Sequence, residues 1–226
     1  MHQHNSSIVS KSTTTALGLP QFVDRDQELV VVRQEGTQAV PAILCRKTSE
    51  LSGTVRISGS KNVGLKLLTL TPMFRQPVLL RGVPKNNQVR YLLDLLGSLG
   101  LTVSIESETP IGLDVKVHAA TVSRNKFEYQ ELRWCRHMFL LAMSILLRTG
   151  SVEVPLPGYS HYGPRPVDGQ LNGLRKMGVI VHPVKNGIVR MELPDNGLRG
   201  ADIFLSFPSN AVTEALLMVQ HRSLKQ

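Results

Sequence analysis

The sequence predicts an α/β domain built from repeated units, each with short strands and two helices. Strand-like alternation and helical spacing of apolar residues follow one another along the chain. The segment LGSLGLTV at 96–103 matches LRKMGVIV at 174–181. Units of this size bury their apolar faces only against neighbouring units. We therefore predict three pseudo-equivalent units, the third of which is cut short at residue 226.

The first unit is expected between about Leu51 and Val122. Its predicted order is strand, helix, strand, helix and a closing hairpin. Pro84 stops the second strand, and Gly100 ends the second helix. The six elements are predicted over 54–57, 63–70, 78–83, 89–99, 101–105 and 113–117.

The second unit repeats most of this order, and a third unit begins at about Leu198. A hairpin is expected around Asn186-Gly187, a two-residue pair that favours a tight turn. Helix, strand, helix and hairpin strands are predicted over 132–147, 152–156, 167–177, 179–184 and 188–193. In the third unit a strand is predicted over 203–205, and a helix is expected from about Ala211.

Residues 1–42 are expected to form a poorly ordered tail, and residues 43–226 to form the folded domain. SSIVSKSTTT near the start is rich in serine and threonine and shows no helical or strand period. An organelle transit peptide is the alternative, but no arginine precedes Arg25. We favour a plain tail.

Composition points to a soluble globular protein without a membrane span. Hydrophobic residues make up 42% of the chain and charged residues 19%. The longest apolar run, 138–147, is too short to cross a bilayer, and no signal peptide is evident. The only cysteines are Cys45 and Cys135, so a disulfide framework is not expected and a reducing cytoplasm is the predicted location.

The formal charge of +9 admits two kinds of partner, a nucleic acid or an anionic small molecule. The basic residues are dispersed along the chain. Only four tyrosines, six phenylalanines and one tryptophan could stack on bases. We therefore expect an anionic small-molecule substrate and no nucleic acid.

Three predicted turns feed helix starts, where free backbone N–H groups and the helix dipole suit anions. Lys61, Arg136 and Arg165 add full charges near these turns, and arginine matches phosphate geometry. Other interpretations stay open: Lys61 could be a solvated lysine, and Arg136 could pair with Glu131 or Asp168. No His/Cys/Asp/Glu cluster has metal spacing, so we predict neither a metal nor a cofactor.

Three motifs resemble those of UDP-N-acetylglucosamine 1-carboxyvinyltransferases, which are enolpyruvyl transferases. SGSKN at 58–62 is similar to their SGAKN, LPGYSHYGPRPVD at 156–168 to their LPGGCxIGxRPVD, and FPSNAVTE at 207–214 to their FPSVGATE. The resemblance implies the family's inverse α/β barrel of three βαβαββ units. It also implies enolpyruvyl transfer from phosphoenolpyruvate to a uridine nucleotide sugar, as in the first committed step of peptidoglycan synthesis.

The resemblance implies a role for each matched residue. Lys61 would contact phosphoenolpyruvate and the reacting hydroxyl, and Ser160 stands where the family has its loop cysteine. The other implied substrate-binding residues are Asn62, Arg136, Arg165, Pro166, Val167, Asp168, Ser209 and Asn210. Arg136 and Arg165 would bind the phosphate, and residues 166–168 would hold the uracil.

Departures from the family pattern leave other functions open. The loop cysteine, which the antibiotic fosfomycin alkylates in the family, is Ser160 here, and RPVDLH has become RPVDGQ. The family's second domain supplies an acidic residue and further arginines, so a second polypeptide or domain would be needed to complete the cleft. The alternatives are enolpyruvyl transfer to another nucleotide such as UMP, or a non-catalytic nucleotide-binding remnant.

Overall fold

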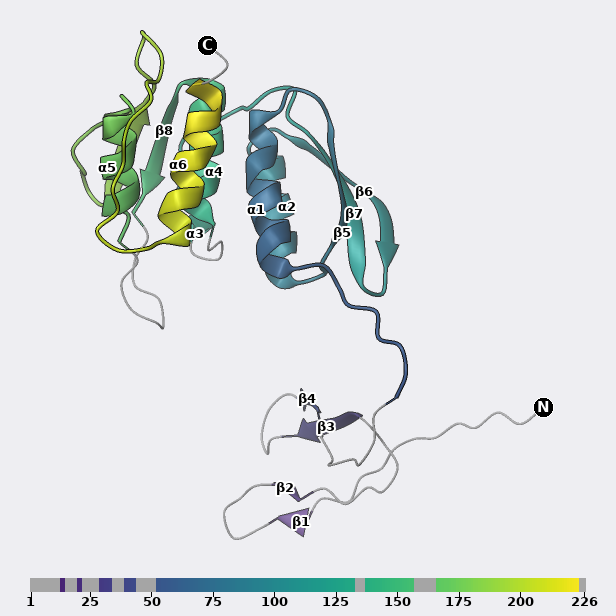
Figure 1. Ribbon diagram of the computed structural model, residues 1–226. Helices are drawn as coiled ribbons and strands as arrows, with labels where there is room; N and C mark the ends of the chain where they lie inside the picture. Colours follow the sequence, from purple (N-terminus) through teal and green to yellow (C-terminus); the bar gives the residue numbers. More distant parts are fainter. Residues whose placement is uncertain are drawn as a thin grey trace. The chain divides into compact units, whose positions relative to one another are not determined.

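The computed structural model describes the backbone of residues 13–14, 20–21, 29–33 and 39–43, and residues 52–132, 137–156 and 166–223. The chain divides into two compact units, Met1–Val55 and Arg56–Gln226, which are described separately (Figure 1). In the first unit the described strands form two antiparallel pairs. These are β1 (Thr13–Thr14) with β2 (Pro20–Gln21), and β3 (Leu29–Arg33) with β4 (Ala39–Ile43). The poorly ordered tail over 1–42 stays a prediction, since most of those residues lie outside the described ranges.

The second unit contains the predicted succession of helices and strands. Its helices are α1 (Lys61–Leu70), the 3-10 helix η1 (Thr71–Met73), α2 (Asn87–Ser98), α3 (Tyr129–Leu132), α4 (Met138–Thr149), α5 (Asp168–Lys176) and α6 (Asn210–Ser223). Its strands are β5 (Val78–Val83), β6 (Thr102–Thr109), β7 (Gly112–His118), β8 (Ser151–Pro155), β9 (Ile180–Val181) and β10 (Ile188–Glu192).

Two three-stranded antiparallel sheets in this unit share one topology. The strand orders are β5-β7-β6 and β8-β10-β9, so in each sheet the last strand of the hairpin lies in the middle. In each case a helix follows the first strand, α2 after β5 and α5 after β8. The second hairpin turns at Asn186 and Gly187, with φ of 53° and 74°, as expected for a two-residue turn of this type. The similarity that the sequence shows between 96–103 and 174–181 thus corresponds to one repeated strand order.

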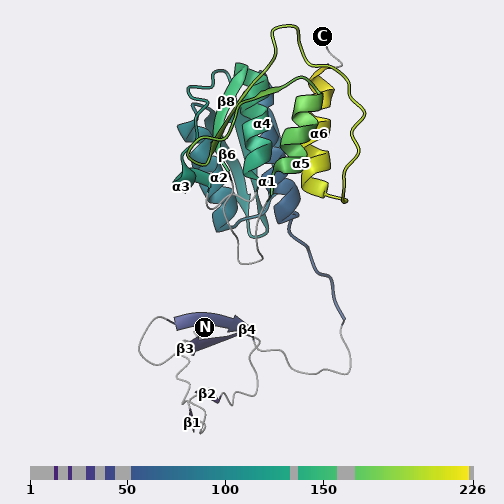
Figure 2. The same ribbon diagram turned by 90° about the vertical axis from the view of Figure 1, so that its left-hand side faces the viewer.

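The helices pack on the inner faces of the sheets. On β10, Val189 and Met191 are buried whereas Ile188 and Arg190 are exposed, and β8 and β7 alternate in a similar way. Helix α4 is buried at nine of its twelve positions and contacts α1, α6 and β8. It is therefore a central helix, apolar on nearly all sides. Figure 2 shows the helices grouped side by side in a second view.

A buried serine connects two of the central helices. Ser144 of α4 is fully buried, and its hydroxyl donates to the carbonyl of Thr69 on α1 and to that of Leu140 in its own helix. Its Oγ also lies 3.9 Å from Sδ of Met218 on α6. The serine that interrupts the apolar run 138–147 thus lies where three helices meet, and its hydroxyl is satisfied by backbone carbonyls.

Two strands that the sequence predicts are not formed. Residues 54–57 and 203–205 have no regular structure, and Val55, Ile57 and Phe204 are 85%, 87% and 90% exposed. An alternating segment becomes a strand only when a neighbour takes its hydrogen bonds. Residues 125–127 do have such a neighbour: Phe127 N–H donates to Glu153 O (3.0 Å) and Glu153 N–H to Asn125 O (2.9 Å). Within the described residues, 54–57 and 203–205 have none.

The helix predicted over 132–147 also differs from the structure. Helix α3 ends at Leu132 and α4 begins at Met138, while residues 133–136 lie outside the described ranges. The end of α4 agrees with the prediction, since Gly150 caps it in the left-handed conformation with φ of +84°. Among the described residues, no helix is long and apolar enough to span a membrane.

Candidate functional site

The SGSKN segment forms the capped start of α1. Ser60 is the N-cap, and its Oγ accepts from the N–H of Val63 (3.4 Å), while the N–H of Gly64 donates to Ser60 O (2.9 Å). The N–H groups of Lys61 and Asn62 therefore precede the first intrahelical bond. Both side chains are exposed. The start of α1 thus presents backbone donors and a lysine ammonium to solvent.

Close glycine contacts hold this turn against β5. A Cβ built on Gly59 would lie 2.3 Å from the carbonyl oxygen of Gly82, and one built on Gly64 would lie 3.2 Å from Cδ of Pro84. No larger residue fits at Gly59 unless the backbone moves. Gly59, the glycine of the motif, is therefore required by backbone packing just before α1.

The predicted uracil-binding residues lie at the start of α5. Val167 is the N-cap of α5 and is buried, whereas Pro166 and Asp168 on either side of it are exposed. Leu171 N–H donates to Val167 O (2.9 Å). Asp168 occupies the first helical position, where a carboxylate is favoured by the helix dipole. Its exposed carboxylate is free to face a polar ligand group.

The third motif caps α6. Ser209 accepts through its carbonyl oxygen from both the N–H and the hydroxyl of Thr213, each at 3.0 Å, and through Oγ from the N–H of Val212 (3.4 Å). Ser209 is half-buried and Asn210 is exposed. Ser209 thus caps α6.

Side-chain contacts show that α5 and α6 run in parallel. A Cβ built on Gly169 of α5 would meet Val212 of α6 at 3.0 Å, and one built on Gly173 would meet Leu216 at 2.6 Å. Both pairs are four residues apart along their helices, so α5 and α6 run in the same direction and in register.

An ion pair between Lys66 and Glu214 extends this alignment to α1. These residues occupy the sixth position of α1 and the fifth of α6. The starts of α1, α5 and α6 consequently lie at one end of the unit, as both ribbon views show (Figures 1 and 2). The structure thus brings Lys61, Asn62, Pro166, Val167, Asp168, Ser209 and Asn210 to the same end.

This end of the unit has the electrostatics of an anion site. Three parallel helix dipoles present their positive ends together, and Lys61 adds a full charge. Asp168 contributes the opposite charge at the α5 start. Three further predicted site residues, Arg136, Ser160 and Arg165, lie outside the described residues.

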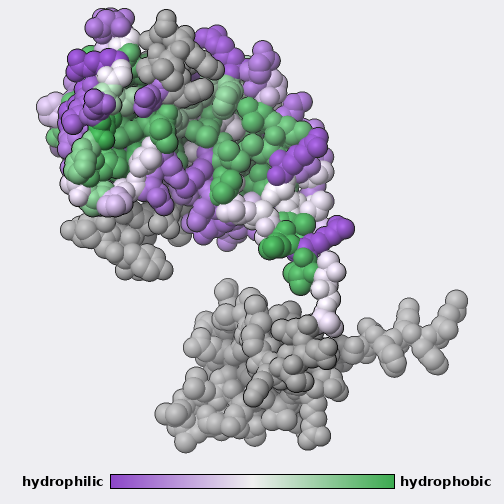
Figure 3. Space-filling view, in the orientation of Figure 1, coloured by the Kyte–Doolittle hydropathy of each residue, from purple (hydrophilic) through white to green (hydrophobic). Residues whose placement is uncertain are grey.

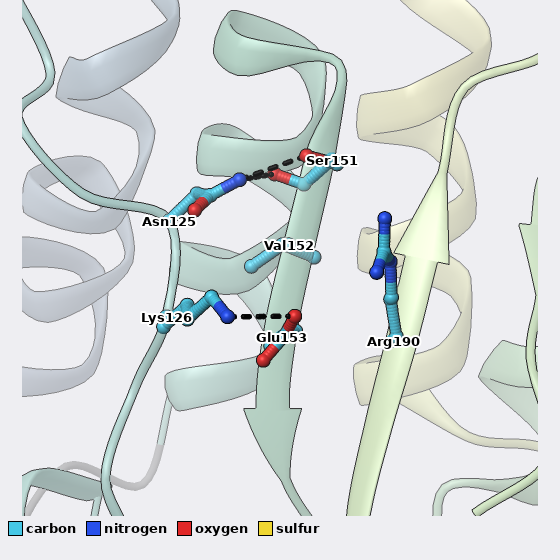
Figure 4. Close-up of a pocket in the computed structure, with 6 residues that line it drawn as sticks. All are labelled: Asn125, Lys126, Ser151, Val152, Glu153 and Arg190. Atoms are coloured by element: carbon cyan, nitrogen blue, oxygen red, sulfur yellow. Dashed lines mark hydrogen bonds and ion pairs between the residues drawn. The ribbon is translucent and has the colours of Figure 1, made fainter.

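A separate small pocket lies on the outer face of the sheet formed by β8, β10 and β9 (Figure 4). It has a volume of about 160 Å³ and is lined by Asn125, Lys126, Ser151, Val152, Glu153 and Arg190. Lys126 pairs with Glu153 (3.1 Å), and Arg190 pairs with Glu192. Asn125 donates to the carbonyl and Oγ of Ser151 (3.1 and 2.8 Å). These contacts fasten residues 125–126 to β8, and the cations are already neutralised.

The described part of the chain contains no candidate metal-binding site. Over those ranges, no three His, Cys, Asp or Glu side chains lie close enough to hold a metal ion together.

Comparisons with known proteins point to one family. The family model for EPSP synthase (3-phosphoshikimate 1-carboxyvinyltransferase) matches residues 45–224. The UDP-N-acetylglucosamine 1-carboxyvinyltransferase of Acinetobacter baylyi is 36% identical over 169 residues, which are 75% of this chain and 39% of the relative. Its counterpart in Prochlorococcus marinus (strain NATL1A) is 28% identical over 169 residues, 74% of this chain and 36% of that protein. The chain thus spans about two fifths of the length of these relatives.

A solved structure shows the same fold. The enolpyruvyl transferase NikO from Streptomyces tendae superposes with a TM-score of 0.52 at 18% identity, over 63% of this chain and 30% of NikO. At this identity the likeness concerns the fold alone. It agrees with the α/β architecture that the sequence predicts, whereas the three-unit barrel and the shortened third unit stay predictions.

Proposed function

The chain belongs to the EPSP synthase (3-phosphoshikimate 1-carboxyvinyltransferase) family, and from this membership we propose that it is part of an enolpyruvyl transferase acting on a uridine nucleotide sugar. The proposed donor is phosphoenolpyruvate, and the proposed acceptor is a hydroxyl of UDP-N-acetylglucosamine, the substrate in the names of the relatives. The observation that carries the proposal is the common location of the α1, α5 and α6 starts. A role in peptidoglycan synthesis and a cytoplasmic location belong to the same proposal.

The proposed reaction is an addition followed by an elimination. The acceptor hydroxyl gives up its proton to a base as its oxygen bonds to C2 of phosphoenolpyruvate, and a proton is added to C3. Loss of inorganic phosphate from C2 and of a proton from C3 then restores the double bond in the product. Negative charge develops on the departing phosphate, so cations and oriented N–H groups that surround it lower the barrier. Helix starts supply such groups without reorganisation during the reaction.

We assign the chain's residues to two parts of the substrates. Lys61, with Arg136 and Arg165, is proposed to hold phosphate and the reacting region. Asn62, Ser209 and Asn210 are proposed to contact the nucleotide sugar. Pro166, Val167 and Asp168 are proposed to hold the uracil, because an exposed carboxylate accepts from an imide N–H and a proline ring packs against a base. Ser160 takes the place of the family's loop cysteine in this proposal.

A second domain or polypeptide is part of the proposal. The chain spans about two fifths of its relatives, and the acid–base residue for the acceptor hydroxyl is proposed to come from the portion that it does not span. The alternative acceptor, UMP, is permitted by a departure in sequence: Gly169 and Gln170 replace the leucine and histidine that follow RPVD in the resembling enzymes.

Titration calorimetry with UDP-N-acetylglucosamine, UMP and inorganic phosphate tests the proposal. We expect UDP-N-acetylglucosamine to bind more tightly than UMP. Lys61→Ala and Arg165→Ala should each weaken binding by about 1.5–3 kcal/mol, the range for hydrogen bonds to charged groups. Lys116→Ala, which removes an exposed lysine from β7, is the matched control and should bind like the unaltered chain.

The outcomes separate the alternatives. If UMP binds more tightly than UDP-N-acetylglucosamine, UMP is the acceptor. Nucleotide binding without phosphate release from phosphoenolpyruvate, even after the second domain of a relative is added, would identify a non-catalytic binding module. If the Lys61→Ala and Lys116→Ala variants bind the nucleotide and phosphate with equal affinity, the start of α1 is not part of the binding site.

A further inference from the structure

The strand that supports the SGSKN turn contains a β-bulge. In the β5–β7 ladder, Leu80 pairs with Val115 and Val83 pairs with Leu113, so β5 has one residue more than β7 between these pairs. Gly82 lies in the bulge with φ of +69°, a conformation that favours glycine. The bulge releases the N–H of Gly82 from the ladder and turns it toward a side chain.

That side chain is Asp114, which lies between Leu113 and Val115 on β7. The N–H of Gly82 donates to Oδ1 of Asp114 at 2.9 Å. A hydrogen bond to a carboxylate is stronger than one between neutral groups, and it fixes an otherwise adaptable glycine. Asp114 therefore determines the orientation of the Gly82 peptide.

The Gly82 peptide in turn contacts the turn that leads into α1. Three glycines meet here: a Cβ on Gly59 would lie 2.3 Å from Gly82 O, and one on Gly112 would lie 3.2 Å from Gly82 Cα. Gly64, in the first turn of α1, packs on Pro84 just after the bulge. The contact between Gly59 and the Gly82 carbonyl involves backbone atoms, so a shift of that carbonyl acts directly on the Gly59 backbone.

We propose that Asp114 is a positioning residue for the anion-binding start of α1. By holding the bulge at Gly82, it places the Gly59 turn. The turn in turn places the backbone N–H groups of Lys61 and Asn62 and the ammonium of Lys61. Asp114 touches no substrate in this account. The ligand-binding part of the inference rests on the proposed function, whereas the effect on the turn does not.

The test compares ¹⁵N-labelled full-length variants by nuclear magnetic resonance. Asp114→Ala removes the acceptor, and Asp114→Asn keeps an oxygen in its place. Asp94→Ala, at an exposed position of α2, is the matched control. We expect Asp114→Ala to shift the amide signals of residues 59–62, Asp114→Asn to restore most of them, and Asp94→Ala to leave them unchanged. Affinity for inorganic phosphate should fall several-fold in Asp114→Ala and recover in Asp114→Asn.

Each outcome decides the inference. Unchanged amide signals at 59–62 in Asp114→Ala would overturn it, as would a loss of phosphate affinity that Asp114→Asn does not recover. If Asp114→Ala does not fold, Asp114→Glu replaces it, because the longer side chain keeps the carboxylate but displaces Gly82; signals at 59–62 that match the unaltered chain would then overturn it. If the unaltered chain binds no phosphate, the proposed function fails, and the amide signals alone still decide the role of Asp114.

Discussion

Lys66 of α1 forms an ion pair with Glu214 of α6, 148 residues further along the chain. Both side chains are about one-third exposed, and the pair joins two helices whose starts form the candidate site. Neither residue was predicted from the sequence as part of the site. Glu214 belongs to the FPSNAVTE motif, and this membership is the feature of the sequence that could have placed it near the site.

A double-mutant cycle should detect this pair. Lys66→Ala and Glu214→Ala are expected to couple by about 0.5–1 kcal/mol in urea unfolding, because partly exposed pairs contribute in that range. The double reversal Lys66→Glu/Glu214→Lys should recover most of the stability that either reversal loses. The Lys85–Glu108 pair, whose glutamate is 50% exposed, is the control and should couple less strongly. Zero coupling between Lys66 and Glu214 would contradict the structure.

Gly59 and Gly97 should respond in opposite ways to alanine. Gly59→Ala forces a methyl group against the carbonyl of Gly82 and should cost about 1–3 kcal/mol. Gly97 lies in α2 with nothing within 4 Å of an added Cβ, so Gly97→Ala should stabilise the chain by up to about 1 kcal/mol. Thermal and urea unfolding measure both changes. A neutral Gly59→Ala variant would mean that the turn does not pack on β5 as described.

Acid should weaken the contact between Arg124 and Glu131. The hydrogen bond that Arg124 donates holds the pKa of Glu131 below its ordinary value of 4.5, although burial opposes the shift. A lowered folded-state pKa stabilises the fold above the unfolded-state value, and this contribution is lost as the pH falls through the folded-state pKa. Glu131→Gln should therefore be less stable than the unaltered chain at pH 7, and the difference should shrink below about pH 4.5.

Glu108 provides the comparison for that experiment. Lys85 also lowers the pKa of Glu108, but this carboxylate is half exposed, so Glu108→Gln should change the pH dependence less. Unfolding curves between pH 3 and pH 7 for both variants give the answer. A constant stability difference between Glu131→Gln and the unaltered chain at every pH would refute the assignment.

Two exposed apolar segments, residues 54–57 and 203–205, should make the chain associate with itself. Figure 3 shows hydrophobic surface on the face that includes α1 and on the segment leading into it. Ile57 and Phe204 are 87% and 90% exposed. Exposed alternating segments offer both apolar surface and unpaired backbone groups. Sedimentation velocity should show a mass that rises with concentration, and Ile57→Asp/Phe204→Asp should reduce it.

Ile111, which is 41% exposed, serves as the control position. Ile111→Asp adds one negative charge outside the two segments, like each single change in the double variant, and should leave the association as it is. If both variants reduce the association equally, added charge alone is responsible. A mass that stays constant with concentration in the unaltered chain would rule out the association itself.

Fosfomycin should leave the chain unmodified. We propose that Ser160 stands where the resembling UDP-N-acetylglucosamine 1-carboxyvinyltransferases have their reactive cysteine; it lies outside the described residues. A serine hydroxyl is a much weaker acid than a thiol and needs a partnered base to attack an epoxide. Intact-mass spectrometry should show no adduct on the unaltered chain, whereas Ser160→Cys should become modifiable once a second domain completes the cleft. A drug-sized mass gain mapped to Ser160 would reverse this interpretation.

The sequence by itself determined the local elements and the motifs. Helical spacing, Pro84, Gly100, Gly150 and the Asn186-Gly187 turn act on their immediate neighbours. The helices and hairpins that they predict are therefore formed within a few residues of the expected bounds, except for the later start of α4. The SGSKN and FPSN segments likewise cap helices, because serine satisfies the N–H groups two or three residues ahead of it.

Only the tertiary structure decided which local signals had partners. Alternation at 54–57 and 203–205 equals that of true strands, but a strand also requires hydrogen-bonded neighbours, and chain position does not reveal them. The Lys66–Glu214 pair, the contact of Gly59 with Gly82 and the Asp114 bond each join residues distant in sequence. The ion pair forms because α1 lies beside α6, whereas the other two contacts form at the bulge of β5. The parallel packing of the helices brings the three helix starts to one end.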